Sequence, residues 1–198
     1  MVDAGVASGQ CSAMQTTEIV EAGGALLFVR RLTGQHEAAA CAAIMSTSEP
    51  WVTLGRTYER SLAVVTDPDA EVYVAVPAAE APGPAAVAGF LVLGMRGAFT
   101  GYIRTVALHA EWRGRGLGTA LIAFAERRVL REAPNVFLCV SSFNGRARAL
   151  YLRLGYEVVG ELRDYLVRGH SEWLLRKSVA PLAEFTPAPM PPAPAAGA

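Results

Sequence analysis

Lysine is almost missing from this sequence, and its charge is balanced. Lys177 is the only lysine, and the 18 basic residues, otherwise arginine, are matched by 18 acidic ones. Proteins that bind nucleic acid or an anionic membrane usually carry an excess of positive charge. We therefore expect neither nucleic acid nor a membrane as a partner.

Cysteine and histidine are also scarce, which argues against two further kinds of site. The three cysteines, Cys11, Cys41 and Cys139, form no Cys-x-x-Cys pair and have no histidine cluster near them. Zinc sites and disulfide-stapled domains depend on such spacings. We therefore expect reduced thiols and no bound metal.

Long apolar runs are absent as well. No run reaches the roughly 18 apolar residues that a membrane helix needs. The N-terminal residues show no basic segment followed by an apolar one, which a secretory signal would have. The expectation is a soluble, cytoplasmic protein.

The composition divides the chain into three parts. Residues 1–24 are small and polar without periodicity, so we expect a flexible leader there. Residues 180–198 are rich in alanine and proline, which predicts a disordered tail. A single folded domain is predicted over residues 25–179, a length that can bury a substantial core.

Hydrophobic periodicity predicts alternating strands and helices in that domain. Strands are expected at 25–32, 71–76, 86–95, 101–108, 136–141, 156–166 and 172–176, and helices at 35–45, 54–65, 117–131 and 144–154. The segment 77–84, rich in proline, glycine and alanine, is predicted to be a mobile loop. The fold class is therefore α/β, with a central sheet of about seven strands.

The most informative segment is a glycine-rich turn between the strand at 101–108 and the helix at 117–131. It reads Arg113-Gly114-Arg115-Gly116-Leu117-Gly118-Thr119. Glycine allows successive backbone N–H groups to turn toward one anion, and the helix start adds unpaired donors and a positive dipole end. This pattern predicts a pyrophosphate site. A purely structural strand-to-helix turn is the alternative.

Two other nucleotide-binding motifs fit this turn less well. A Rossmann motif would need glycine at position 119, where the chain has Thr119. A P-loop would need Gly-Lys-Ser/Thr, and Lys177 lies far downstream. Neither a dinucleotide nor a nucleoside triphosphate is therefore the expected ligand.

The turn and a second motif together resemble the GNAT acetyltransferases. The acyl-CoA loop of that family reads Arg/Gln-x-x-Gly-x-Gly/Ala, and the segment 113–118 matches every defined position. Downstream, Asn144, the helical segment 146–151 and Gly155-Tyr156 are similar to the family's asparagine, Ala-x-x-Leu-Tyr helix and Gly-Phe/Tyr. The resemblance covers residues 26–177.

The resemblance implies a GNAT fold, a mixed sheet flanked by helices whose fourth and fifth strands are splayed to admit acetyl-CoA. Those strands are 101–108 and 136–141 in this sequence. Acetyl-CoA would then be the acyl-donor cosubstrate, and no metal is implied. Its expected contacts are Val106, Ala107, Leu108, Arg113, Gly114, Arg115, Gly116, Leu117, Gly118, Thr119 and Asn144.

The resemblance also implies that a primary amine attacks the thioester directly, in a ternary complex. Tyr151 would then protonate the departing thiolate, although it could instead only pack its helix against the sheet. Some relatives carry a glutamate base where this chain has Cys139, so that role does not carry over. Glu49 is the substitute candidate, and an ordinary solvated glutamate is the alternative.

The acceptor site is expected beside these residues. Trp51, next to Glu49, and Tyr165, in the terminal hairpin, would line it, and Glu172 in the same hairpin adds an acidic group. The predicted function is acetyl transfer to a protein N-terminus, a lysine or a small amine. Two other functions are left open: an acyl-CoA-binding sensor without activity, and an antibiotic or polyamine acetyltransferase. A homodimer formed through the hairpin is also left open.

Overall fold

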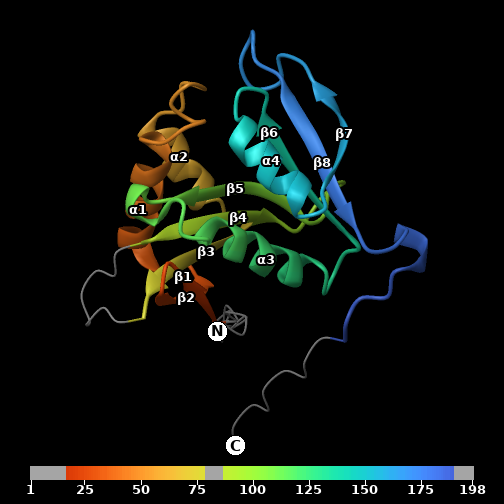
Figure 1. The fold of residues 1–198 in the computed structure, drawn as a ribbon, viewed down its shortest axis with the longest axis horizontal. Helices are drawn as coiled ribbons and strands as arrows, with labels where there is room; N and C mark the ends of the chain where they lie inside the picture. Colours follow the sequence, from red (N-terminus) through yellow and green to blue (C-terminus); the bar gives the residue numbers. More distant parts are fainter. Residues whose placement is uncertain (1–16, 79–86, 190–198) are drawn as a thin grey trace, which may run out of the picture.

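The centre of the structure is an eight-stranded mixed sheet (Figure 1). The computed structural model describes residues 17–78 and 87–189. The strand order is β1-β2-β3-β4-β5-β6-β8-β7. The strands are β1 (Glu18–Ala22), β2 (Ala25–Arg31), β3 (Ala70–Pro77), β4 (Gly89–Gly94), β5 (Tyr102–Leu108), β6 (Asn135–Ser141), β7 (Glu157–Leu162) and β8 (Glu172–Ser178).

Helices cover both faces of this sheet and bury a separate apolar cluster on each. The helices are α1 (Gly34–Ser46), α2 (Tyr58–Val65), α3 (Leu117–Val129) and α4 (Gly145–Arg153). Ile44 and Val65 of α1 and α2 pack with Phe90 on one face. Leu121 and Phe124 of α3 pack with Leu138 on the other face, together with Leu150 of α4. The predicted α/β class and its flanking helices are confirmed.

Strands β5 and β6 lie side by side only where they begin. Their parallel pairing consists of Tyr102 with Phe137 and Ile103 with Leu138. On the other side of β5, the register with β4 shifts so that Arg104 has no partner opposite it, a β-bulge that bends the strand. No described strand pairs with the β6-facing edge of β5 beyond Ile103, which confirms the splay.

An eighth strand, β1, is the main correction to the predicted fold. It lies inside the segment 1–24 that was predicted to be a flexible leader, and five residue pairs join it to β2. Val20 and Ala22 are buried while Ile19 and Glu21 are exposed, an alternation typical of an edge strand. Five residues are too few for this period to stand out in the sequence. Residues 1–16 of the predicted leader lie outside the described residues.

Other predicted boundaries also shift. Helix α2 begins at Tyr58 rather than 54, because Thr57 caps it by accepting a hydrogen bond from Arg60 N–H at 3.3 Å. In the predicted tail, a 3-10 turn forms at Leu182–Glu184, and Ala188 N–H donates to Arg131 O at 2.9 Å. Residues 190–198 of the tail, and 79–84 of the predicted mobile loop, lie outside the described residues.

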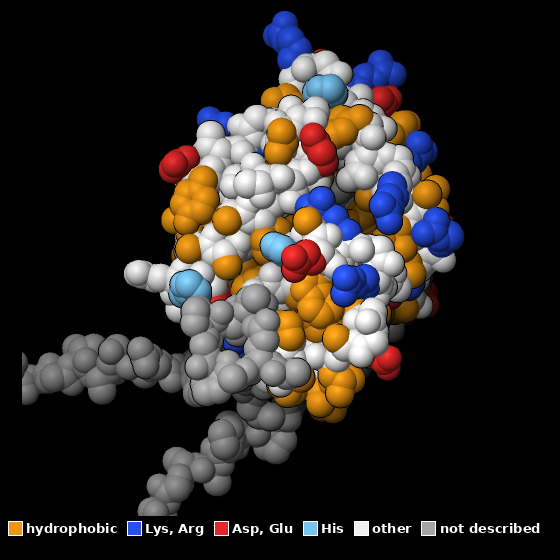
Figure 2. All heavy atoms as spheres, turned by 60° about the vertical axis from the view of Figure 1, so that its left-hand side comes forward, with side chains coloured by type: hydrophobic (Ala, Val, Ile, Leu, Met, Phe, Trp, Pro, Cys, Tyr) orange, Lys and Arg blue, Asp and Glu red, His pale blue; other side chains and the backbone are white. Residues whose placement is uncertain are grey.

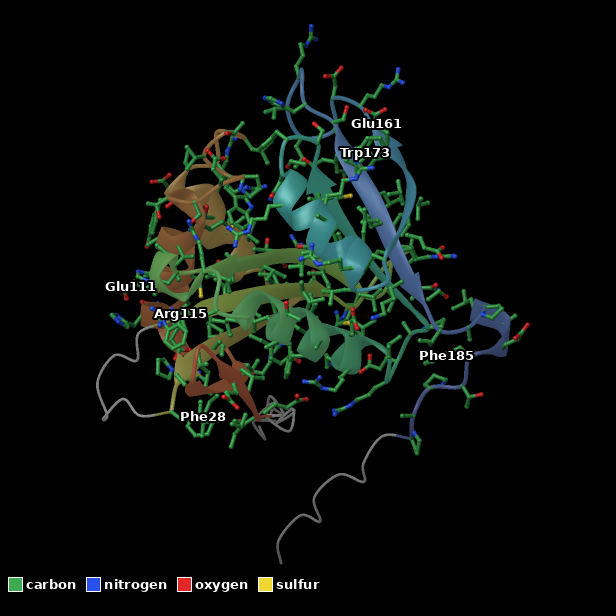
Figure 3. The ribbon with its side chains drawn as sticks, viewed as in Figure 1. Phe28, Glu111, Arg115, Glu161, Trp173 and Phe185 are labelled. Atoms are coloured by element: carbon green, nitrogen blue, oxygen red, sulfur yellow. The ribbon has the colours of Figure 1, made fainter. Side chains whose placement is uncertain are left out.

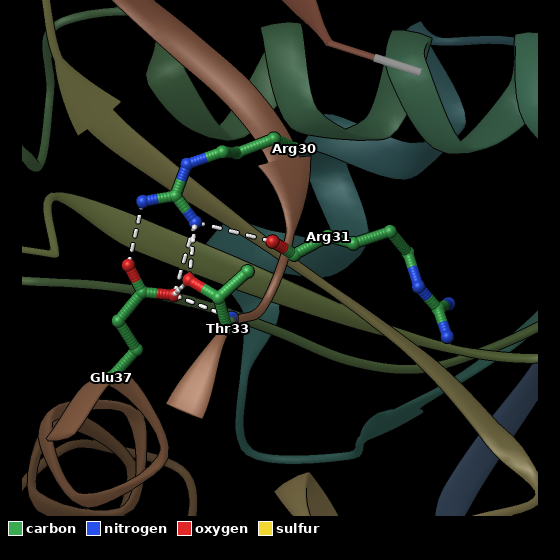
Figure 4. Close-up of polar contacts among 4 residues, drawn as sticks. All are labelled: Arg30, Arg31, Thr33 and Glu37. Atoms are coloured by element: carbon green, nitrogen blue, oxygen red, sulfur yellow. Dashed lines mark hydrogen bonds and ion pairs between the residues drawn. The ribbon is translucent and has the colours of Figure 1, made fainter. Parts of the chain in front are cut away.

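An ion pair fixes the start of α1 against β2 (Figure 4). Arg30 Nη2 lies 2.6 Å from Glu37 Oε1, and Thr33 N–H donates to Glu37 Oε2 at 2.7 Å. Burial acts to raise the pKa of Glu37, but the hydrogen bonds from Arg30 and Thr33 outweigh it and lower that pKa. The pair therefore holds a charged carboxylate in a largely buried position and fixes the helix that leads into the α1–α2 loop.

None of the helices in the described part of the chain has both the length and the apolar character needed to cross a membrane.

Candidate functional site

Two adjoining cavities open where β5 and β6 separate. The loop cavity, about 380 Å³, is lined by the glycine-rich turn before α3. The sheet cavity, about 400 Å³, is lined by residues of β5, β6 and β8. Five residues line both cavities and mark their junction: Glu49, Trp51, Val106, Asn144 and Ala147. Figure 2 shows the side of the molecule that carries α1, with a hollow near the centre of the view and charged side chains around it.

The loop cavity has the features of an anion site. Gly114 and Gly116 have φ angles of +76° and +88°, a left-handed conformation that favours glycine. Gly116 is the N-cap of α3 and has no side chain to bond the first N–H groups of that helix. Three arginines, Arg113, Arg146 and Arg153, also line the cavity. A pyrophosphate fits such a combination of free backbone donors, helix dipole and guanidinium groups.

Most of the predicted acetyl-CoA contacts line this cavity, namely Val106, Ala107, Leu108, Arg113, Gly114, Gly116, Gly118, Thr119 and Asn144. The side chains of Arg115 and Leu117 do not. Leu117 is fully buried in the core, and the guanidinium of Arg115 lies 5.7 Å from the ring centre of Trp112, at the position labelled in Figure 3. Arg115 and Leu117 are thus the two predicted contacts that do not line the loop cavity.

A hydrogen bond ties the glycine-rich turn to the α1–α2 loop. Arg113 Nη2 donates to Ser48 Oγ at 2.6 Å, and Arg113 Nε donates to Leu108 O at 3.3 Å. Ser48 and Arg153 also line the loop cavity, and neither was predicted from the sequence. Their contribution depends on how the α1–α2 loop and α4 meet at the splay, and no local pattern signals that meeting.

The sheet cavity contains a row of polar side chains from three neighbouring strands. Tyr102 on β5, Cys139 and Ser141 on β6, and Glu172 on β8 all line it. Ser141 and Glu172 are paired across the two strands, so their side chains lie on the same face. Ser141 Oγ donates to Glu172 Oε1 at 2.5 Å. Glu172 was predicted near the acceptor site, whereas Tyr102 and Ser141 were not predicted from the sequence.

Burial shifts the acid–base properties of this row. Burial raises the pKa of Tyr102, and a hydrogen bond with the Cys139 thiol adds to that rise. Burial also raises the pKa of Cys139, which makes it a poor thiolate and a weak candidate nucleophile. Burial raises the pKa of Glu172 too, although its bond from Ser141 and the nearby His170 partly oppose the rise. Glu172 carries the only carboxyl group among these four side chains, the group type with the lowest ordinary pKa, and is therefore the candidate base of the row.

Tyr151 approaches the sheet cavity from α4. Helix α4 begins at its N-cap Asn144, whose Oδ1 accepts a hydrogen bond from Ala147 N–H at 3.2 Å. The ring of Tyr151 packs edge-to-face on Tyr156, with ring centres 5.8 Å apart. Burial raises the pKa of Tyr151 to about 12, so the phenol keeps its proton at neutral pH. A protonated hydroxyl therefore lines a cavity that also contains a carboxylate.

The other three predicted site residues lie at the rim. Glu49 is exposed, and its Oε2 accepts a hydrogen bond from Thr53 N–H at 3.3 Å. Trp51 is half-buried at the junction of the cavities, and Tyr165, which is 58% exposed, lines the sheet cavity from the β7–β8 turn. The structure thus brings Tyr151, Glu49, Trp51 and Tyr165 to one hollow.

Comparisons with known proteins agree with this architecture. An N-alpha-acetyltransferase of Sulfurisphaera tokodaii is 33% identical over 78 residues, which cover 38% of this chain and 46% of that protein. The match therefore spans less than half the length of that relative.

Two solved structures share the fold at low sequence identity. The NAA60 protein of Arabidopsis thaliana, in complex with acetyl-CoA, superposes with a TM-score of 0.63 at 19% identity, over 77% of this chain and 98% of that one. An aminoglycoside 6'-N-acetyltransferase complexed with coenzyme A gives a TM-score of 0.60 at 16% identity, over 77% and 97%.

The sequence itself matches a family model. Residues 36–156, more than half of the chain, match the model of the acetyltransferase (GNAT) family. The matched region contains the glycine-rich turn, the splayed strands and α4. The chain therefore belongs to the GNAT acetyltransferase family.

Proposed function

We propose that this protein transfers an acetyl group from acetyl-CoA to a primary amine, by direct attack in a ternary complex. The observation that carries the proposal is the junction of the two cavities at Val106, Asn144 and Ala147. An anion site lies on one side of the junction, and a polar pocket with a carboxylate and a phenol lies on the other. Two substrates can therefore meet there without a covalent enzyme intermediate.

The donor fits the loop cavity. Its pyrophosphate would bind the backbone of the turn and the arginines, and its pantetheine arm would run along the β6-facing edge of β5 at Val106–Leu108. That edge has no strand partner among the described residues, so its backbone groups are available. A backbone N–H directed at the thioester carbonyl would stabilise the negative charge that develops on that oxygen.

The chemistry then requires two proton transfers. The amine must lose a proton before its nitrogen can attack the carbonyl carbon, and the sulfur must gain one as the C–S bond breaks. Tyr151 is proposed as the donor to sulfur, because its phenol is protonated and lines the sheet cavity. Glu49 and Glu172 are the carboxylates that line this cavity, and either could receive the proton of the amine.

The favoured acceptor is the α-amino group of a peptide. The named relative is an N-alpha-acetyltransferase, which is the specific observation in favour of this class. An α-amino group has a pKa of roughly 8, compared with about 10.4 for lysine, so more of it is neutral under physiological conditions. Polyamines and aminoglycosides are the competing acceptors.

The test is release of CoA thiol by the purified chain with acetyl-CoA and four amines. These are a lysine-free peptide with a free α-amine, a lysine peptide with a blocked N-terminus, spermidine and kanamycin. Release with the first amine, and a product heavier by one acetyl group, is the expected result. Binding of acetyl-CoA by calorimetry without release to any amine would instead support the sensor.

A further inference from the structure

Glu172 is a buried carboxylate inside the sheet cavity. Its residue is only 3% exposed, yet it lines the cavity from the first position of β8. The basic side chain that acts on its pKa is His170, and it acts only electrostatically, without a hydrogen bond. Its hydrogen bond within the protein comes from the neutral Ser141 hydroxyl. A carboxylate buried without an arginine or lysine partner is costly, and a cationic ligand would offset that cost.

Glu49, the other carboxylate of the cavity, lies in a different environment. It is exposed on the α1–α2 loop, where its one hydrogen bond, from Thr53 N–H, is 3.3 Å long. Water screens a charge in that position, so its attraction for an amine is weak. The buried Glu172 interacts through a medium of lower effective dielectric constant and is fixed by Ser141. Position and electrostatics therefore favour Glu172 over Glu49 as the proton acceptor.

The neighbours of Glu172 do not neutralise it. The titratable groups coupled to it are Tyr102 on β5, Cys139 on β6 and His170 in the β7–β8 turn, and Tyr165 lines the same cavity. Two arginines also line the cavity: Arg104, paired with Asp67 at 2.6 Å, and Arg56. Glu172 thus remains the group with free capacity to bind an ammonium ion.

We propose that Glu172 binds the ammonium form of the acceptor and takes the proton that the amine must lose. In this step an N–H bond of the ammonium breaks, and its proton moves to Glu172 Oε. The neutral nitrogen then attacks the thioester carbonyl carbon, the C–S bond breaks, and Tyr151 protonates the sulfur. The second proton lost from nitrogen returns to Tyr151, and Glu172 releases its proton to water. This assignment rests on the proposed acetyl transfer.

The assignment predicts a specific dependence on pH. With Glu172 present, kcat/KM rises with pH as the Glu172 carboxyl group ionises. This rise occurs at a higher pH than for an ordinary glutamate, because burial raises the pKa of Glu172. Without this base, only amine that is already neutral can react. Activity would then rise with the ionisation of the amine itself, at higher pH.

The experiment measures kcat/KM against pH with the fastest amine of the four-member panel. Glu172→Gln keeps the shape of the side chain and an oxygen for Ser141, and it should lower kcat/KM at pH 7 about 100-fold. The acidic limb of the kcat/KM profile of this variant should move to the pKa of the amine, while the Kd for acetyl-CoA stays unchanged. Glu161→Gln, on the neighbouring strand β7 outside both cavities, is the matched control and should behave like the unaltered protein.

A second variant provides a readout that does not depend on Glu172→Gln folding. Ser141→Ala removes the hydrogen bond that opposes the rise in the Glu172 pKa. Its acid limb should therefore move to higher pH, while the rate on the alkaline plateau is retained. Glu49→Gln should leave the position of the limb unchanged, whatever its effect on rate.

Three results overturn the assignment in distinguishable ways. Unchanged pH profiles in both Glu172→Gln and Ser141→Ala would show that Glu172 is not the base, while the proposal of acetyl transfer would stand. If the acidic limb of the kcat/KM profile moves in Glu49→Gln instead, Glu49 in the α1–α2 loop is the base. No transfer by the unaltered protein to any amine of the panel would overturn the proposed function and this inference together.

Discussion

Tyr151 is the residue on which the proposed protonation of sulfur depends. Its hydroxyl is the group that Tyr151→Phe removes, while the ring and its packing on Tyr156 remain. We expect kcat to fall about 100-fold, because a positioned acid contributes at least this much. Acetyl-CoA affinity should be retained, as calorimetry would show. Equal kcat values for the two proteins would assign Tyr151 to packing alone.

Gly118 offers a second test at the residue scale, directed at the donor. A Cβ built at this position lies 3.5 Å from Leu108 Cδ1, an ordinary contact, so Gly118→Ala should fold and bind. Gly118→Asp places a carboxylate in the loop cavity, against the expected pyrophosphate. We expect at least a 100-fold loss of acetyl-CoA affinity by calorimetry for Asp, and a small loss for Ala. Similar affinities for both variants would argue against a pyrophosphate at this turn.

Site residues could be predicted from the sequence where the backbone conformation itself requires a particular residue type, such as glycine. The glycine-rich turn was recognised because Gly114 and Gly116 occupy left-handed conformations that favour glycine. Tyr102 and Ser141 were missed because only the splay of β5 and β6 makes their strand positions face a cavity. Strand periodicity alone cannot distinguish a side chain that lines a cavity from one that packs.

At the scale of elements, the residue that caps helix α4 also lines the candidate site. Asn144 caps this helix and lines both cavities, whereas Thr57 caps α2 and lines neither. Either cap changed to alanine should cost about 1 kcal/mol of unfolding free energy. Only Asn144→Ala should also weaken acetyl-CoA binding. Denaturant unfolding and calorimetry on the two variants would separate these effects, and equal binding would confine Asn144 to capping.

The Arg30–Glu37 ion pair between β2 and α1 should make the stability of the protein depend on pH. Arg30→Met leaves Glu37 buried without its main partner, and we expect a loss of about 2 kcal/mol at pH 7 because the pair is only partly exposed. The pKa of Glu37 is lowered in the folded state, so the contribution is present above the ordinary glutamate range and lost as pH falls. The two proteins should therefore become similar near pH 3 in urea unfolding. A difference that persists there would contradict the ion pair as its cause.

The elements that the sequence predicted well are those with a long, strong period. Helix α3 and the buried strands β3 and β4 were placed to within about three residues, because their apolar positions repeat over many residues. The short edge strand β1 was missed, and the end of β7 was placed four residues too late. That strand ends at Leu162 because the β7–β8 turn folds back through Asp164, whose Oδ1 accepts from Gly169 N–H at 2.6 Å.

For the whole molecule, buried tyrosines predict a loss of stability in alkali. Burial raises the pKa of both Tyr73 and Tyr151 to about 12. The folded state then binds more protons than the unfolded chain, whose tyrosines ionise near 10. Stability should hold below pH 10 and fall as pH rises toward 12, measured by urea unfolding. Tyr151→Phe should show a smaller fall, and a flat profile would contradict the burial of these phenols.

The central claim for the molecule is that two substrates meet at the junction of two cavities. Initial rates of CoA thiol release, measured over a grid of acetyl-CoA and free α-amine peptide concentrations, test it most directly. Direct attack in a ternary complex predicts intersecting lines in double-reciprocal plots. Parallel lines would indicate a covalent acetyl-enzyme and contradict the proposed mechanism, and absence of acceptor-dependent release with every amine of the panel would contradict acetyl transfer itself.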